Sequence, residues 1–160
     1  NLLIPLAEIG TDTVVANGGV IHAPKLVQWY NASVYGKITR FEPRDANSGV
    51  VGYMAPPLDG VWATAPFLHN GSVPTIAQLL DSDSRPKVWR RTDFDTRHFD
   101  QEQLGWPHEA LNIRQADAPK AQQKWIYDTG HWSQSNSGHT YGDAVSASQR
   151  RSLLEYIKTL

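Results

Sequence analysis

The stretch that decides the fold is YMAPPLDGVWATAPFLHNGSVPT, residues 53–75 of the 160-residue sequence. Proline restricts the backbone and glycine allows turns, so the density of both, together with aromatic residues, predicts a packed but irregular loop over residues 49–71. Such a loop can hold a side chain rigidly. One histidine, His69, stands inside it between Leu68 and Asn70.

Two helix starts can be recognised in the sequence. Residues 72–75 form a capped entry with a proline near the first turn, and the helix that follows is expected to end near Ser82. A second helix is expected after Ser146, because Gln149 three residues later completes a capping box. Apolar residues at helical spacing predict that this C-terminal helix is amphipathic. They are Leu153, Leu154, Ile157 and Leu160.

The N-terminal quarter of the chain gives a weaker pattern. Residues 1–19 are apolar and suggest a short helix or a pair of turns. Residues 21–38 contain short aromatic and β-branched runs that Pro24 and Gly36 interrupt. Proline and glycine mark turns and breaks, so short interrupted elements are expected here.

The segment between the two expected helices is predicted to be mostly surface structure. Residues 85–100 mix charged and aromatic side chains, which favours an exposed hairpin or arm over a core element. Residues 100–128 are polar and suggest surface structure around a short helix, and residues 127–142 form another glycine, serine and asparagine loop. The expected fold is therefore mainly α with extensive irregular loops.

Composition excludes several functions. There are 15 Lys and Arg against 16 Asp and Glu, for a net charge of -1, so no basic surface is expected for nucleic acid or anionic lipid. No apolar run reaches the roughly 20 residues that span a bilayer. The chain has no cysteine, which excludes disulfides, thiolate catalysis, iron–sulfur ligation and covalent haem attachment within these residues.

The histidines are the residues most suited to bind a metal or a cofactor in this sequence. None of the six histidines has the spacing of a self-contained zinc site. His69 and His139 differ from the others because glycine lies close to each, which lets the backbone approach a bulky partner. From composition alone, each imidazole either faces a cofactor or hydrogen-bonds across its own turn.

The tryptophans and the acidic residues could likewise have either a functional or a structural role. The six tryptophans could form a sugar-binding platform or pack in the core, and Trp62 in the proline-rich loop is the one expected beside a cofactor. Asp93, Asp95 and residues 98–100 are candidates for acid–base chemistry, although charge runs of this kind are usually solvated surface.

Residues 53–75 resemble the C-terminal part of bacterial di-haem c-type cytochromes of the cytochrome c peroxidase superfamily. The sequence of residues 62–75 is most similar to the branch with rubber oxygenases and haem fatty-acid dioxygenases. Residues 136–142 and the chain end at 153–160 look like the close of such proteins. The resemblance implies a single C-terminal cytochrome c-like module over residues 1–160, forming the distal half of a haem domain.

The resemblance also implies a cofactor, haem c, and a set of residues around it. In the classical peroxidases of this superfamily, a methionine after the loop binds the electron-transfer haem. Here the one methionine, Met54, lies before the loop, so His139 is the preferred axial ligand and His69 the alternative. The other residues expected at the cofactor are Trp62, Pro66 and Tyr141. An iron held by two histidines is usually closed to other ligands, so such a haem would relay electrons.

The absence of cysteine is the main departure from the family. Its members attach each haem through Cys-x-x-Cys-His, so the anchors are expected outside this chain, in a missing N-terminal haem-bearing part of the same protein or in a second chain. The reactive haem, with its small-molecule substrate or oxidant, is expected there too. The family also implies a periplasmic or secreted location. The alternative function is a haem-free binding domain, for example for carbohydrate, that uses surface tryptophans.

Overall fold

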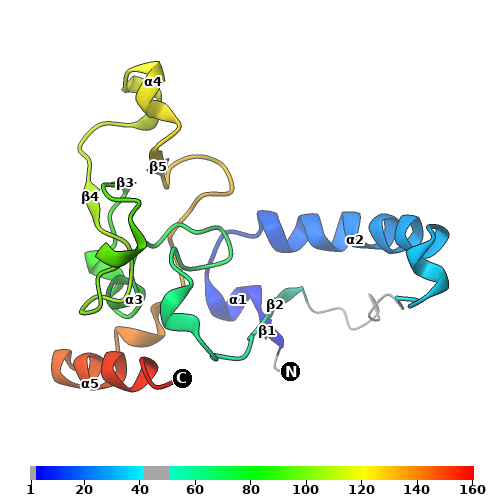
Figure 1. Ribbon diagram of the computed structural model, residues 1–160, viewed down its shortest axis with the longest axis horizontal. Helices are drawn as coiled ribbons and strands as arrows, with labels where there is room; N and C mark the ends of the chain where they lie inside the picture. Colours follow the sequence, from blue (N-terminus) through cyan, green and yellow to red (C-terminus); the bar gives the residue numbers. More distant parts are fainter. Residues whose placement is uncertain (1–2, 42–50) are drawn as a thin grey trace.

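The computed structural model describes residues 3–41 and 51–160. Apart from two helices, Val14–Ala32 and Ala147–Ile157, its regular elements are short, and long loops join them (Figure 1). The α-helices are α1 Leu6–Ile9, α2 Val14–Ala32, α3 Ile76–Leu79, α4 Lys120–Gln123 and α5 Ala147–Ile157. The strands are β1 Leu3–Pro5, β2 Gly52–Met54, β3 Val88–Arg91, β4 His108–Ala110 and β5 Ile126–Asp128. Single turns of 3-10 helix lie between them, including Val61–Ala63 and Thr140–Gly142.

The strands form two small antiparallel sheets. β1 pairs with β2, and β3 lies between β4 and β5. The domain is therefore mixed α/β, and the expectation of a mainly α fold holds only in part. The exposed arm predicted over residues 85–100 is also partly wrong, because Val88 and Trp89 of the central strand are buried. Both strand neighbours of β3 come from later in the chain, beyond the reach of a local pattern.

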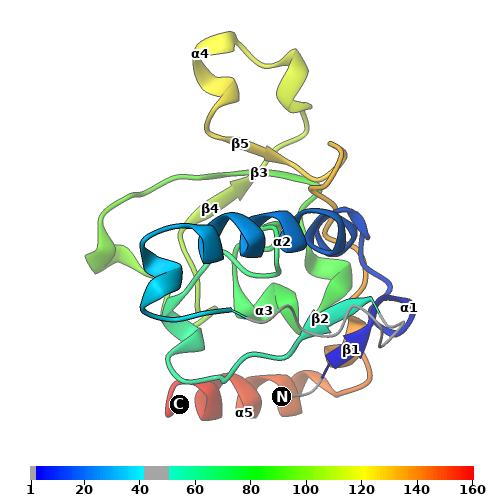
Figure 2. The ribbon, with the colours of Figure 1, turned by 90° about the vertical axis from the view of Figure 1, so that its right-hand side faces the viewer.

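The main core lies under the loop at residues 61–76. Phe67, Val73, Ile76, Leu104 and Leu154 form one buried cluster. It joins this loop to α3 and to α5, which runs below them (Figure 2). A smaller cluster of Val88, Ala118 and Ile126 packs on the three-stranded sheet.

Both predicted helix starts are confirmed. The Thr75 hydroxyl accepts a hydrogen bond from the Gln78 main-chain amide at 3.2 Å, and α3 begins at the next residue. Ser146 and Gln149 form the expected capping box at the start of α5. Leu154 is the residue of α5 that enters the core.

The N-terminal expectation is wrong in one respect. Residues 14–32 form a single helix that continues through Pro24, where interrupted short runs were predicted. In the described part of the chain this helix contains no buried residue, and Figure 1 shows it extending away from the body of the molecule. Residues 1 and 49, at which two of the predicted segments begin, lie outside the described residues.

Candidate functional site

A mostly apolar cavity of about 610 Å³ lies where the two histidine loops meet. Its walls come from β1, β2, the loop at 61–69, the end of α3 and the turn at 139–142. Pro66, His69, His139 and Tyr141 all line it. Trp62 instead packs against the main core, with its ring edge toward Phe99 at 6.4 Å between centroids. The structure thus brings together four of the five residues expected at a cofactor.

His69 is presented by a tight turn. The main-chain amide of Phe67 donates to the Val73 carbonyl at 2.7 Å, and that of Val73 donates back at 3.3 Å, which closes the loop at its base. The Asn70 amide group donates to the carbonyls of Ser133 and Ser135, at 3.3 and 2.8 Å. The turn that carries His69 is therefore tied directly to the loop that leads to His139.

The His69 imidazole stacks on the Tyr53 ring, with 4.4 Å between centroids and 22° between planes. Both of its ring nitrogens are buried and lack a hydrogen-bond partner among the described residues. Leaving a buried polar atom unpaired costs about 1–3 kcal/mol. A turn-ordering role does not account for this imidazole, because its nitrogens are not used in the turn.

His139 is held by its backbone. It adopts a left-handed conformation with φ of 52°, directly after Gly138 with φ of 73°. Its amide donates to the Ile9 carbonyl at 2.9 Å. A Cβ on Gly138 would lie 2.4 Å from that same carbonyl oxygen, so glycine is required for the loop to approach the end of α1.

The two imidazoles lie side by side, with 6.1 Å between ring centroids and 33° between planes. Nδ1 of His139 is buried and has no hydrogen-bond partner in the described ranges. Burial lowers the pKa of His69, with Asp12 partly opposing it. Burial, then the His69 imidazole and the Arg85 guanidinium, lower the pKa of His139. Neutral imidazoles with free lone pairs can bind a metal.

Several residues that support this pair were not singled out from the sequence. Oδ2 of Asp12 and the Tyr53 hydroxyl are buried without a partner among residues 3–41 and 51–160. Burial first, and Asp12 second, raise the pKa of Tyr127 to about 12, and the Tyr127 hydroxyl donates to the Asn70 carbonyl at 2.8 Å. Arg85, in the segment predicted to be exposed, is buried behind His139.

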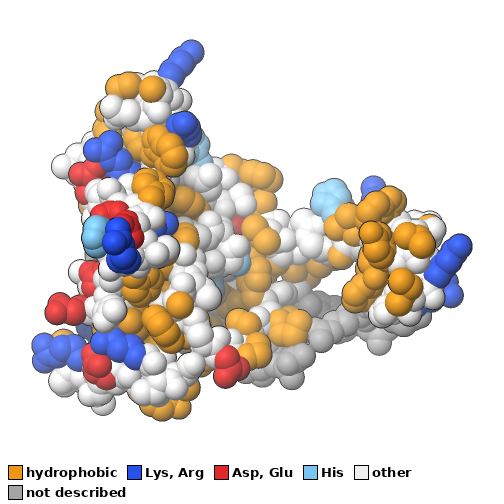
Figure 3. Space-filling view, viewed as in Figure 1, with side chains coloured by type: hydrophobic (Ala, Val, Ile, Leu, Met, Phe, Trp, Pro, Cys, Tyr) orange, Lys and Arg blue, Asp and Glu red, His pale blue; other side chains and the backbone are white. Residues whose placement is uncertain are grey.

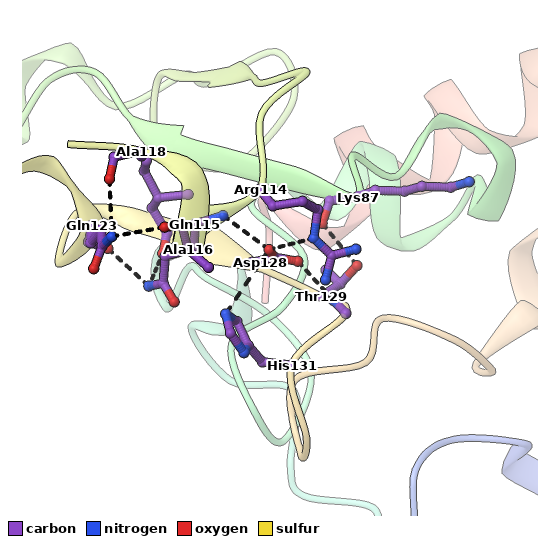
Figure 4. A network of polar contacts seen from close by, with 11 residues as sticks. Lys87, Arg114, Gln115, Ala116, Ala118, Gln123, Asp128, Thr129 and His131 are labelled. Atoms are coloured by element: carbon purple, nitrogen blue, oxygen red, sulfur yellow. Dashed lines mark hydrogen bonds and ion pairs between the residues drawn. The ribbon is translucent and has the colours of Figure 1, made fainter. Parts of the chain in front are cut away.

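The remaining candidates lie away from the cavity. The Asp93 carboxylate contacts His98 at 2.6 Å, and Asp95 pairs with Arg97, both on the surface. His131 lies 4.0 Å from Asp128, whose carboxylate organises the turns around β5 (Figure 4). Within the described residues, no group of three or more potential ligands could hold a metal ion by itself.

Asp128 has a structural role in that network. Its carboxylate accepts hydrogen bonds from the main chain of Gln115 and Gly130 and from Arg114. Burial alone would raise the pKa of Asp128, but these donors together hold it below its ordinary value. Asp128 therefore stabilises the turns that it contacts.

Comparison with known proteins places a family segment on the same loop. Residues 52–90 match the model of the RoxA-like, cytochrome c-like family. This segment contains His69 and Arg85, and His139 lies outside it. The chain thus carries a partial cytochrome c-like region, and without cysteine it has no means of attaching haem covalently.

Two proteins of Sinorhizobium fredii are similar over longer stretches. The uncharacterized protein y4iJ is 30% identical over 168 residues, covering 95% of this chain and 26% of y4iJ. The uncharacterized protein y4iM is 33% identical over 123 residues, covering 69% of this chain and 28% of y4iM. The chain therefore spans about a quarter of the length of these relatives. Among the described helices, none is long and apolar enough to cross a membrane.

Proposed function

We propose that this chain forms the distal side of one haem site in a di-haem c-type oxidoreductase and serves in electron transfer. The observation that carries the proposal is a pair of half-buried imidazoles, from loops far apart in the sequence, that bring buried ring nitrogens to one apolar cavity. The cytochrome c-like segment that includes His69 supports it independently.

The residues at the cavity fit a haem. Its volume of about 610 Å³ lies in the usual range for cofactor sites, and its walls are predominantly apolar side chains. The buried imidazole nitrogens without partners are suited to coordinate iron. When bound there, haem supplies a one-electron carrier.

His139 is the preferred axial ligand in this proposal, with His69 beside it as the alternative. Tyr53 stacks on His69 and would limit its movement. Pro66 and Tyr141 line the wall and would exclude water from the cofactor. The neutral state of both imidazoles, favoured by burial, keeps their lone pairs available.

The rest of the site would come from a haem-bearing part of the same protein. Relatives that are much longer than this chain support a partner of this kind, and so does the absence of cysteine here. The reactive haem of a peroxidase or oxygenase, with its substrate or oxidant, would belong to that part. Because c-type haem is attached outside the bacterial cytoplasm, the proposal includes a periplasmic or secreted location.

The test is the spectrum of the full protein made in a host that attaches c-type haem. We expect a Soret band, and electron paramagnetic resonance should show a low-spin haem. His139→Ala should convert that signal to high spin, while His69→Ala shifts it without converting it. The control is His131→Ala, since His131 is largely exposed and lies outside the cavity.

Two results would count against the proposal. A full protein without a Soret band would exclude the cytochrome function and favour the haem-free binding domain. That alternative has some support, because Trp29, Trp125 and Trp132 are exposed. Conversion to high spin by His69→Ala, with His139→Ala unchanged, would exchange the roles of the two histidines.

A further inference from the structure

Arg85 is a buried cation whose donors are all used on main-chain carbonyls. Nε donates to Gln78 at 3.1 Å, and Nη2 donates to Leu79 at 2.9 Å and to His139 at 3.0 Å. Nη1 donates to Asn136 at 2.9 Å and to Gly138 at 2.7 Å. A guanidinium has five N–H donors, so each of them has a carbonyl partner.

The five carbonyls belong to two separate segments. Gln78 and Leu79 lie in α3, which follows the loop that carries His69. The other three belong to residues 136–139, the loop that carries His139. Arg85 therefore joins α3 to the loop that carries His139 through one rigid planar group. Because the backbone of His139 itself accepts one of the bonds, any displacement of the guanidinium would move that residue.

The charge of Arg85 is only indirectly compensated. Within the part of the chain that the structure describes, no carboxylate lies within ion-pairing distance of it. Asp143 binds the amide and hydroxyl of Ser82, at 2.9 and 2.6 Å, and Asp81 pairs with Arg150 at 3.2 Å. Both aspartates act on Arg85 from a distance. Arg85 as a whole is 8% exposed, so solvent screens its charge weakly.

We propose that Arg85 is a positioning residue that clamps the His139 imidazole at the cavity and raises the reduction potential of the haem iron held there. This inference rests on the proposed function. Reduction lowers the positive charge at the iron by one, so a buried cation close to the ligand favours the reduced form. Net charge and burial are among the properties by which a protein sets a haem potential.

Two substitutions in the full protein separate the clamp from the charge. Arg85→Met removes both the clamp and the charge. It should change the ratio of oxidised to reduced iron at least tenfold, which for one electron is a fall of 59 mV in the midpoint potential of this haem. It should also give a high-spin fraction. Arg85→Lys keeps the charge but lacks the planar fork, so the high-spin fraction should appear while the ratio of oxidised to reduced iron changes less than tenfold. Arg85→Gln takes the place of Arg85→Met if that variant does not accumulate.

Arg150→Met is the matched control. Arg150 also donates to a carbonyl at the end of α3, Leu80, at 3.2 Å, but its charge is paired with Asp81 and more exposed. Neither spin state nor potential should change. Equal falls in potential in Arg85→Lys and Arg85→Met would overturn the electrostatic role, and unchanged spectra in both would overturn the clamp. A wild-type protein without haem would instead overturn the proposed function.

Discussion

The longest described helix, α2, and the four-residue helix α3 differ in opposite ways from the burial that their lengths suggest. α2 has 19 residues and none is buried among those the structure describes. α3 has four residues, yet Ile76 is 3% exposed and packs in the main core. Exposed apolar side chains gather along the projecting arm that contains α2 (Figure 3). Regular hydrogen bonding and tertiary packing are therefore separate properties here.

The cavity belongs to the packed region, and none of its lining residues comes from α2. Its loops are fixed by side chains that bond to main-chain carbonyls of other segments, as Asn70 and Arg85 do. Asn136 does the same with the Pro86 carbonyl at 3.0 Å. Such cross-links hold histidines in place without long helices or strands, because each joins segments that are distant in sequence.

Removal of buried volume should give the largest contrast between the two regions. Leu104 is 1% exposed in the main core, whereas Leu26 on α2 is 64% exposed. Leu104→Ala should lower the free energy of unfolding by about 2–5 kcal/mol. Leu26→Ala should change it by no more than about 0.5 kcal/mol. Urea unfolding followed by tryptophan fluorescence measures both, and a similar loss in the two variants would contradict the contrast.

Addition of one methyl group should give a smaller effect of opposite sign in the two regions. A Cβ on Gly142 would lie 2.4 Å from the Leu80 carbonyl oxygen, so Gly142→Ala should destabilise the protein by about 1–3 kcal/mol. No described atom lies within 4 Å of a Cβ on Gly19. Gly19→Ala should therefore stabilise α2 by about 0.8–1.0 kcal/mol, seen as increased helicity by circular dichroism. Loss of helicity in Gly19→Ala would show that α2 is packed in solution.

The sequence predicted best those features that depend on neighbouring residues. The capping patterns at Thr75 and Ser146 need only contacts three residues away, and both helix starts are present. The sheet of β3, β4 and β5 was missed because its short strands pair across long loops. The course of α2 was missed because Pro24 normally interrupts a helix.

The candidate site also contains residues that the sequence could predict and residues that it could not. His69 and His139 could be selected because the glycines near them are visible in the sequence, and the structure brings them to one cavity. Arg85 could not, since it stands in a charged segment and its carbonyl partners belong to α3 and to the loop at residues 136–139, which only the fold brings together. Trp62 was expected at the cavity, but it packs with Phe99 and the core.

The smallest expected effect concerns pH and the histidines without haem. The pKa values of His69 and His139 are lowered in the folded protein, first by burial. As pH falls, the unfolded chain therefore binds protons first, near its ordinary pKa of about 6.5. The stability from these two groups is complete above that pH and is lost as pH falls from about 6.5 toward their lowered values. Urea midpoints from pH 8 to pH 5 should show the loss.

The paired variant His69→Gln/His139→Gln should flatten that dependence, because glutamine does not titrate. His22→Gln is the control from the other region: His22 is exposed on α2, and its replacement should leave the slope unchanged. If the urea midpoint of the paired variant still falls with pH, the titrating groups lie outside the cavity. A slope lost in His22→Gln would mean that α2 is buried when the chain folds, and the two regions would then have to be treated as one cooperative unit.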